Sequence, residues 1–337
     1  MKRLLSIMLV LLLALNLCAF AMAEEVYTDE QGASFKVNYT STNGGTRPQV
    51  TFEYTVTALG TAAGESGAPY PADLPSIAPV EFGETEITAD TTQKTATIKL
   101  SEYTQVGVYE YKITQNTPGT PISGITYYNA PIHLKVTVIE DEEGKIRVAA
   151  VRCGSENDTG GKTDVINNSY ESGSLAISKT VTGNMGDQSQ YFDVKVTLNA
   201  PAGTTPSTDA KVTISASSAQ GQITEISYGT EATLKIKHNE TITLGNIAAG
   251  TTYTVVEADY TGEGIGKGYN AATYIWSDEG GKTVSAGDTD TVQITNNKGI
   301  PVDTGISLDN APYLLLLALA LVGGVLLLLR RRNREKD

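Results

Sequence analysis

Apolar and polar residues alternate with a period of two through much of this 337-residue chain, and this alternation limits the possible folds more than any other feature. The alternation is plain in six segments: 50–56, 108–113, 132–138, 192–198, 253–257 and 292–296. A period of two places one face of a strand in a core and the other in water, as in half-buried antiparallel sheets. Long amphipathic helices are almost absent, so the sequence predicts an all-β protein.

The strands form two series of similar order, which predicts two tandem domains at residues 24–170 and 171–299. Each domain is long enough to bury its own core. The two halves align loosely at three pairs of positions: Ile98 with Ile242, Tyr111 with Tyr253, and Asn168 with Asn296. An imperfect repeat of an immunoglobulin-like β-sandwich explains this match better than one large domain. The link between the halves is short, so we expect a semi-rigid rod.

Both ends of the chain carry signals for export and anchoring. Residues 1–23 combine two basic residues, an apolar run and a small-x-small cleavage site, which is typical of a secretory signal peptide. Residues 311–329 are apolar over nearly the length that a bilayer core requires, and residues 330–337 are rich in arginine. We therefore expect a transmembrane helix at 311–329 with a basic cytoplasmic tail at 330–337.

Composition argues against several classes of function. The formal net charge of −13 makes nucleic acid an unsuitable partner, because phosphate contacts need basic patches. The two histidines, His133 and His238, lie far apart in the sequence and offer little for a catalytic triad or a metal site. The acidic runs at 141–143 and 288–290 lack the ligand spacing of a calcium loop. We therefore expect no metal, no cofactor and no enzyme acting on other molecules.

Three polar residues of the second half stand where the alternation of their strands puts inward-facing side chains: Lys179, Glu257 and Asn296. Burial of unpaired charges is costly, and buried acids and amines tend to become neutral. A neutral amine beside a protonated carboxyl can attack an amide carbonyl and release ammonia. The sequence therefore predicts an isopeptide bond from Lys179 to Asn296, with Glu257 as the catalytic acid. The alternative is that all three are ordinary strand-end residues that reach water.

This pattern resembles the isopeptide-linkage domains of streptococcal T-antigen (FctA-type) major pilins. The residues that carry the resemblance are an opening strand with Lys179, a Gly-x-x-Tyr-x-Val-x-Glu strand ending at Glu257, and a closing strand with Asn296. The resemblance covers nearly the whole mature chain and implies tandem pilin-type (Cna-B-like) sandwiches. It also implies that Lys179 is the nucleophile, Glu257 the acid and Asn296 the acceptor.

The first half departs from that pattern. Asn168 is in place, but Gln115 stands where the family has its acid. Lys36 has the spacing of the family's lysine, yet the alternation of its neighbours turns its side chain outward. Proton transfer needs a protonatable group, which Gln115 lacks. A bond from Lys36 to Asn168 is therefore a second candidate, and a sandwich held by hydrogen bonds alone is the alternative.

Residues 300–310 contain the segment Val-Asp-Thr304-Gly305 ahead of the apolar run and the basic tail. This order resembles the wall-sorting signal of Gram-positive surface proteins, in which a sortase cuts between Thr and Gly and joins the threonyl carboxyl to an amine. The resemblance implies cleavage between Thr304 and Gly305, by a sortase whose identity stays open. The spelling departs from the usual motif, because Pro301 is one residue too far upstream and Asp303 stands in place of a proline.

In such pilins, polymerisation joins the threonine to a lysine just before the closing strand of the first domain, where this chain has Lys162. We therefore expect a structural cell-surface protein, a pilus shaft subunit polymerised by a sortase. The sequence does not itself distinguish a shaft subunit from a base subunit. The implied partners are neighbouring pilin subunits, peptidoglycan and, as further candidates, host-surface ligands; the membrane is contacted only through the anchor of the precursor. The alternative is a singly wall-anchored adhesin, in which Lys162 is a solvated loop lysine.

Overall fold

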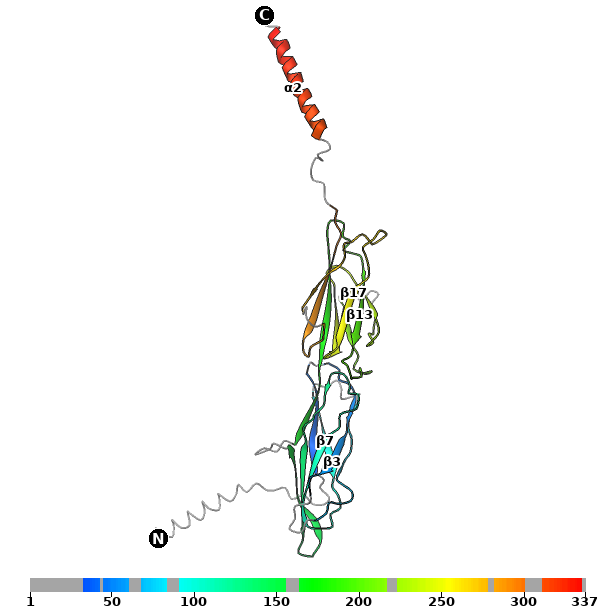
Figure 1. Ribbon diagram of the computed structural model, residues 1–337, viewed down its shortest axis with the longest axis vertical. Coiled ribbons are helices and arrows are strands. Elements are labelled where there is room, and N and C mark those ends of the chain that lie inside the picture. The colour runs from blue at the N-terminus through cyan, green and yellow to red at the C-terminus, as the bar shows by residue number, and fades with distance from the viewer. Residues whose placement is uncertain are drawn as a thin grey trace, which may run out of the picture.

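The computed structural model describes residues 33–42, 45–60, 68–83, 91–155, 164–216, 223–277, 282–300 and 311–334. The predicted signal peptide at 1–23, Lys162, Thr304 and Gly305 lie outside these residues. The described chain forms two β-sandwiches arranged end to end and one helix at the C-terminal end (Figure 1). The prediction of an all-β chain with tandem sandwiches and a C-terminal helix is confirmed.

The first sandwich packs a five-stranded sheet, with the order β4-β6-β1-β11-β8, against a four-stranded sheet, with the order β10-β9-β7-β3, and β2 pairs with β5. The strands are β1 (Ala33–Ser41), β2 (Val50–Phe52), β3 (Tyr54–Ala58), β4 (Ser76–Ile77), β5 (Val80–Phe82), β6 (Thr91–Lys99), β7 (Gly107–Gln115), β8 (Ile125–Thr126), β9 (Ile132–Glu140), β10 (Ile146–Ser155) and β11 (Val165–Tyr170). Alternate residues of β1, β7 and β9 are buried, as a period of two requires. Their inner faces form the core, with Val37, Tyr111 and Leu134 fully buried.

The second sandwich repeats this plan with a five-stranded sheet, β14-β16-β12-β19-β18, and a three-stranded sheet, β15-β13-β17. Its strands are β12 (Ser172–Thr182), β13 (Phe192–Asn199), β14 (Thr213–Ala216), β15 (Ala232–Ile236), β16 (Thr241–Ala248), β17 (Thr252–Glu257), β18 (Thr273–Trp276) and β19 (Thr289–Asn297). Leu175, Ile177, Val194, Leu244 and Ile294 are among its fully buried core residues.

Most strand pairs are antiparallel, but in each sandwich the first strand pairs in parallel with the last. β1 runs alongside β11, and β12 runs alongside β19. The alternation of the sequence does not distinguish parallel from antiparallel pairs, so it did not reveal this arrangement. A covalent link between these two neighbours joins residues that are far apart in sequence but side by side in the sheet.

The two sandwiches contact each other directly at their junction. Only Glu171 separates β11 from β12. The amide of Gln49 donates to Asp209 Oδ2 at 2.6 Å, and Asn246 Nδ2 donates to the Thr46 carbonyl at 3.0 Å. Gly124 has a φ of +80°, and a Cβ at this position would lie 2.7 Å from the carbonyl oxygen of Glu171. These contacts fit the expectation of a semi-rigid rod.

The helix α2 (Ala311–Arg334) follows the second sandwich. Residues Pro312–Arg332 have a mean hydropathy of 2.6 and pack against no other part of the described chain, so this helix is long and apolar enough to cross a membrane. Four arginines, Arg330 to Arg332 and Arg334, lie at its C-terminal end. The helix therefore fits the predicted transmembrane anchor.

Candidate functional site

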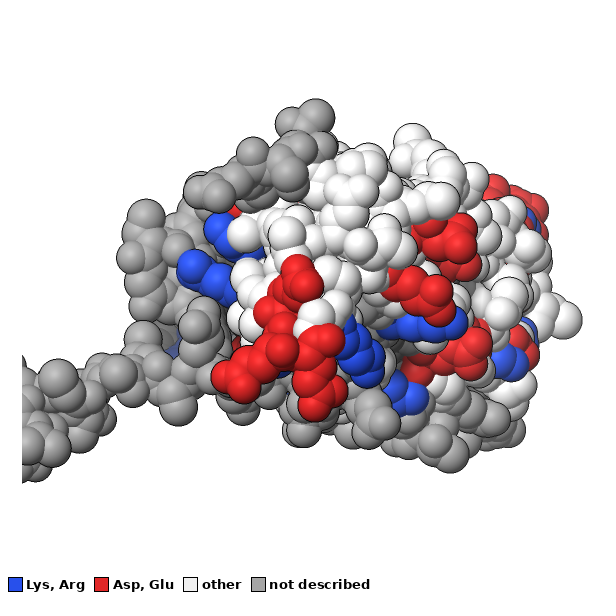
Figure 2. All heavy atoms as spheres, turned by 90° about the horizontal axis from the view of Figure 1, so that it is seen from below, with Lys and Arg blue, Asp and Glu red and all other residues white. Residues whose placement is uncertain are grey.

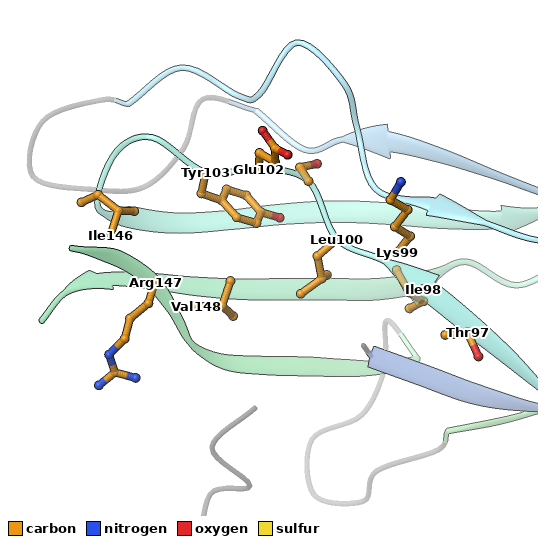
Figure 3. Close-up of a pocket in the computed structure, with 10 residues that line it drawn as sticks. Thr97, Ile98, Lys99, Leu100, Glu102, Tyr103, Ile146, Arg147 and Val148 are labelled. Atoms are coloured by element: carbon orange, nitrogen blue, oxygen red, sulfur yellow. The ribbon is translucent and has the colours of Figure 1, made fainter. Parts of the chain in front are cut away.

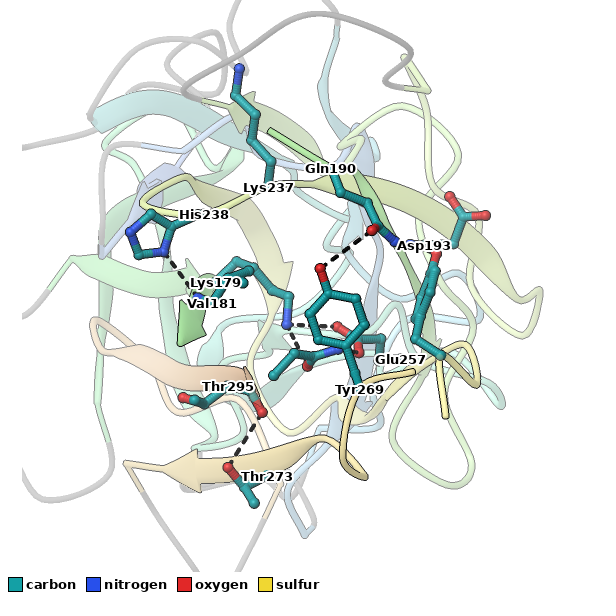
Figure 4. A network of polar contacts seen from close by, with 12 residues as sticks. Lys179, Val181, Gln190, Asp193, Lys237, His238, Glu257, Tyr269, Thr273 and Thr295 are labelled. Carbon is teal, nitrogen blue, oxygen red and sulfur yellow. Dashed lines mark hydrogen bonds and ion pairs between the residues drawn. The ribbon is translucent and has the colours of Figure 1, made fainter. Parts of the chain in front are cut away.

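Lys179, Glu257 and Asn296 come together inside the second sandwich, near the ends of β12, β17 and β19. Figure 4 shows the side chains of Lys179 and Glu257 pointing toward each other. Lys179 lies on β12 and Asn296 on the adjacent parallel strand β19, while Glu257 ends β17 in the facing sheet. The register pairs Val181 with Asn296, so Lys179 is two residues before the partner of Asn296 and shares its inner face. The strand parity seen in the sequence is the reason that these polar side chains point into the core.

Each of the three side chains contacts the other two. Lys179 Nζ donates to Asn296 Oδ1 at 2.6 Å and lies 3.0 Å from Glu257 Oε2. Asn296 Nδ2 donates to Glu257 Oε1 at 2.5 Å. The carboxylate therefore bridges the amine of Lys179 and the amide nitrogen of Asn296, with one oxygen on each.

The site is removed from water. The side chains of Lys179 and Glu257 are 0% and 1% exposed. Burial lowers the pKa of the Lys179 amine below its ordinary value, because desolvation penalises the ammonium more than the nearby Glu257 carboxylate stabilises it. Transfer of a proton between the two groups gives a neutral amine beside a neutral acid, the form that a buried site of low polarity favours.

A cluster of aromatic rings lies beside the amine. The ring centre of Phe192, on β13, lies 4.3 Å from Lys179 Nζ. Tyr260 and Tyr269 pack edge to face on Phe192, with ring centres 4.8 and 5.3 Å away. The hydroxyl of Tyr274 accepts a hydrogen bond from the backbone amide of Glu257 at 2.9 Å and so fixes the end of β17. Sequence reasoning did not assign these four residues to the site. Their aromatic side chains are the signal that could have marked them as core residues.

This arrangement has the parts of an acyl-transfer site that acts on itself. The amine is a nucleophile only when it has lost its proton, and burial favours that form. The carboxyl group can take a proton from the amine through Oε2 and give one to the amide nitrogen through Oε1. No group of three or more metal-ligating side chains occurs among the described residues. The chemistry that this geometry supports is transfer of the Asn296 acyl group from its own nitrogen to that of Lys179.

The corresponding position of the first sandwich lacks the nucleophile. Asn168 on β11 pairs with Tyr39 on β1, so the residue two positions earlier, Val37, stands where Lys179 stands in the second sandwich. Val37 is fully buried. Gln115 takes the place of the acid: its Nε2 donates to Asn168 Oδ1 at 2.7 Å, and Asn168 Nδ2 donates back to Gln115 Oε1 at 3.2 Å. Two amides thus satisfy each other where the second sandwich has the three reactive groups.

Lys36, the second candidate nucleophile, does not approach Asn168. It lies on the outer face of β1, and its Nζ donates to Thr95 Oγ1 at 2.6 Å. The register pairs Lys36 with Val165 and not with Asn168. The structure therefore does not bring the candidate pair Lys36 and Asn168 together, and the cause is the strand parity that the alternation of Phe35 and Val37 had indicated.

Comparison with known proteins identifies relatives of both halves. Residues 21–171 match the family model of the Spy0128-like isopeptide-containing domain, and residues 173–298 match a domain of unknown function (DUF7601). A pilin from Streptococcus pyogenes serotype M1 is 31% identical over 252 residues, which cover 71% of this chain and 72% of that protein.

Solved structures share the two-sandwich fold. The major pilin of Streptococcus pyogenes gives a TM-score of 0.56 at 22% identity, covering 80% of this chain and 99% of that one. The major pilin T3.2 of the same species gives a TM-score of 0.53 at 23% identity, covering 79% and 98% of the two chains. Because the identities are only 22% and 23%, these two comparisons show a shared fold and no more.

Proposed function

Because this chain belongs to the streptococcal pilin family and is a pilus shaft subunit, we propose that its second sandwich closes an isopeptide bond between Lys179 and Asn296 and that a sortase links the subunits through Thr304. The observation that carries the first part is the three-way contact of Lys179, Glu257 and Asn296 in a buried site. The second part rests on the C-terminal sequence signal and on the family.

Bond formation begins with a proton transfer. Glu257 Oε2 accepts a proton from Lys179 Nζ, which is 3.0 Å away, and leaves a neutral amine. The amine lies against the carbonyl group of Asn296, 2.6 Å from its oxygen, and attacks the carbonyl carbon. Water has little access to the reacting groups, because the side chains of Lys179 and Glu257 are 0% and 1% exposed and the ring of Phe192 lies against the amine.

Collapse of the intermediate releases ammonia. Glu257 Oε1 lies 2.5 Å from Asn296 Nδ2 and supplies the proton that this nitrogen needs to leave. A carbon–nitrogen bond forms to Lys179 Nζ, the bond to Nδ2 breaks, and the attacking nitrogen gives a second proton to Glu257. Of the two protons that Glu257 takes from Lys179 Nζ, one leaves with the ammonia and the other stays on the carboxyl group, so the protein loses one ammonia and needs no cofactor for this step.

The bond would protect the sandwich in two ways. It joins residues 117 positions apart, and a cross-link over a loop of that length stabilises a fold by about 4 to 5 kcal/mol in the loop-entropy model. It also connects neighbouring parallel strands at the first and last positions of the domain. Tension that enters through β12 and leaves through β19 would then pass through the covalent link, and the strands between them would carry no load.

Polymerisation would explain why the proposed bond lies in the second sandwich. In the proposed fibre, Thr304 of one subunit is joined to Lys162 of the next. Every strand from β1 to β10 precedes Lys162 in sequence, whereas β11 and the whole second sandwich lie between Lys162 and Thr304. Load would therefore bypass most of the first sandwich and pass through the second, which is the one with the reactive lysine.

Gel analysis of cell-wall extracts tests the proposal. The wild-type chain should give a ladder of covalent multimers, and both Thr304→Ala and Lys162→Ala should abolish it. Lys145→Ala, which removes an exposed turn lysine from the same sandwich, is the matched control and should leave the ladder intact. A single wall-linked species in place of a ladder would favour the singly anchored adhesin. A ladder that persists in Lys162→Ala would assign the acceptor to another lysine.

A further inference from the structure

A glycine-rich loop at the C-terminal end of the second sandwich holds an isoleucine in full contact with solvent. The loop Gly262–Gly268 has positive φ at all four of its glycines. Ile265, at its centre, is 105% exposed. Positive φ is a conformation that glycine adopts without strain, so the alternate glycines shape a turn that projects the one apolar side chain.

Hydrogen bonds fix this loop. Gln190 Nε2 donates to the Gly266 carbonyl at 2.8 Å, and Lys298 Nζ donates to the Lys267 carbonyl at 2.5 Å. The backbone amide of Gly268 donates to the Thr261 carbonyl at 3.2 Å. An isoleucine on a loop that is tied down in this way cannot turn inward to avoid water.

Two more apolar side chains are exposed on segments bonded to the same end. Met185 is 53% exposed and Ile300 is 63% exposed. Asn184 fixes the backbone of Ile300 by two hydrogen bonds, and the amide of Met185 donates to the Lys298 carbonyl at 3.0 Å. We name Met185, Ile265 and Ile300 the apolar end. Grouped apolar side chains on a fixed surface mark an interaction site more often than scattered ones do.

The far end of the first sandwich is hollowed. A groove of about 560 Å³ runs between the segment Lys99–Tyr103 and the start of β10. Leu100, Ile146 and Val148 give it an apolar lining, and Arg147 extends from its edge (Figure 3). Carboxylates gather at this end of the molecule (Figure 2), where the turn after β9 carries Asp141, Glu142 and Glu143.

Both ends carry a charge of either sign beside their apolar side chains. The loop at the apolar end carries Glu263 and Lys267 on either side of Ile265, and the groove has both Arg147 and Glu102 in its lining. Two different surfaces at opposite ends of a rod form a heterologous contact, which builds an open chain and not a closed dimer.

The proposed transfer of Thr304 brings these ends together, and the inference rests on it. Thr304 is four residues beyond Ile300, so its carbonyl reaches at most about 14 Å from the last described residue of the sandwich. Any subunit that receives Thr304 must therefore lie against the apolar end. We propose that the occupant of the groove is the Ile265 loop of a second copy of this chain, and that this docking orders the subunits before and after they are joined.

Disulfide trapping tests the docking without a sortase. Ile265→Cys and Glu102→Cys are made in separate full-length chains with a protease site between Gly305 and Asn310, and the released chains are mixed and oxidised. Both positions are exposed, so neither change should affect folding. Cys153 is retained, since burial raises the pKa of its thiol to about 12 and keeps it unreactive.

The mixture should form the 265–102 heterodimer several-fold faster than a matched mixture of Ile265→Cys with Thr57→Cys, an exposed position on β3 that does not line the groove. Equal rates would overturn the docking and would leave the bilayer beneath the anchored precursor as the surface that the apolar end faces. Because no transfer of Thr304 is needed, a failure here leaves the cell-wall ladder unaffected, and a missing ladder leaves the trapping result readable.

Discussion

Val37 of the first sandwich occupies the position that Lys179 occupies in the second. Each precedes by two residues the strand partner of an asparagine, Asn168 in one sandwich and Asn296 in the other. Both are fully buried, and in each sandwich the asparagine is hydrogen-bonded to a residue that ends a strand of the facing sheet, Gln115 or Glu257. The two halves therefore share one framework, and only the second has a nucleophile and an acid in it.

Restoring these two groups should create a bond in the first sandwich. The double variant Val37→Lys with Gln115→Glu places an amine and a carboxyl beside Asn168, and we expect its mass to fall by one further ammonia. The same pair with Asn168→Ala is the matched control and should keep its full mass. Lys36→Ala in the wild-type chain should change the intact mass only by the difference between the two side chains. A double variant that folds and loses no ammonia would contradict the equivalence of Val37 and Lys179.

Removing the acceptor should separate the stabilities of the two sandwiches. Asn296→Ala prevents the proposed cross-link and leaves Lys179 and Glu257 as a buried pair. Loss of about 4 to 5 kcal/mol lowers the unfolding temperature of a domain this size by on the order of 15 °C. Calorimetry should show that shift for the second sandwich and little change for the first. Asn297→Ala, at the neighbouring and exposed position on β19, is the control.

The pH dependence of stability should report the state of Lys179. In Asn296→Ala the amine stays free, and its folded-state pKa lies below the unfolded value because of burial. Above the pH at which the folded pair of Lys179 and Glu257 loses its shared proton, the unfolded chain binds more protons than the folded one, so stability rises with pH up to the ordinary pKa of lysine. In the wild-type chain the nitrogen is an amide and does not titrate.

Urea unfolding at a series of pH values from about 6 to about 10, close to the ordinary pKa of lysine, measures this difference. The stability gap between wild type and Asn296→Ala should narrow as the pH rises. A gap that is constant or widens would show that Lys179 is not the group that burial penalises.

The sequence alone predicted the fold class, and it placed Lys179, Glu257 and Asn296 on inward faces, because alternation reports which side of a strand a residue faces. It also predicted that the side chain of Lys36 faces outward, as it does in the structure. It did not identify Val37 as the counterpart of Lys179, since an apolar residue at an apolar position carries no signal. That identification needed the parallel register of β1 with β11, which is a tertiary property.

The surroundings of the site were equally hidden. Phe192 contacts Lys179 from the other sheet. Tyr260 and Tyr269 pack on Phe192 from a segment that lies far from it in the sequence. Such contacts depend on how two sheets pack, which strand periodicity does not encode. The same holds for the fixed position of Ile265, because its exposure depends on bonds from Gln190 and Lys298 to the loop.

The intact mass of the mature chain, released from its anchor, tests the central claim most directly. We expect a mass one ammonia below that of the sequence, and Glu257→Gln, which keeps the shape of the site but removes the acid, should restore the full mass. The Glu263→Gln variant, changed at an exposed loop position, should retain the deficit. A wild-type chain at full mass would contradict the bond between Lys179 and Asn296, and a deficit of two ammonias would contradict the absence of a nucleophile at Val37.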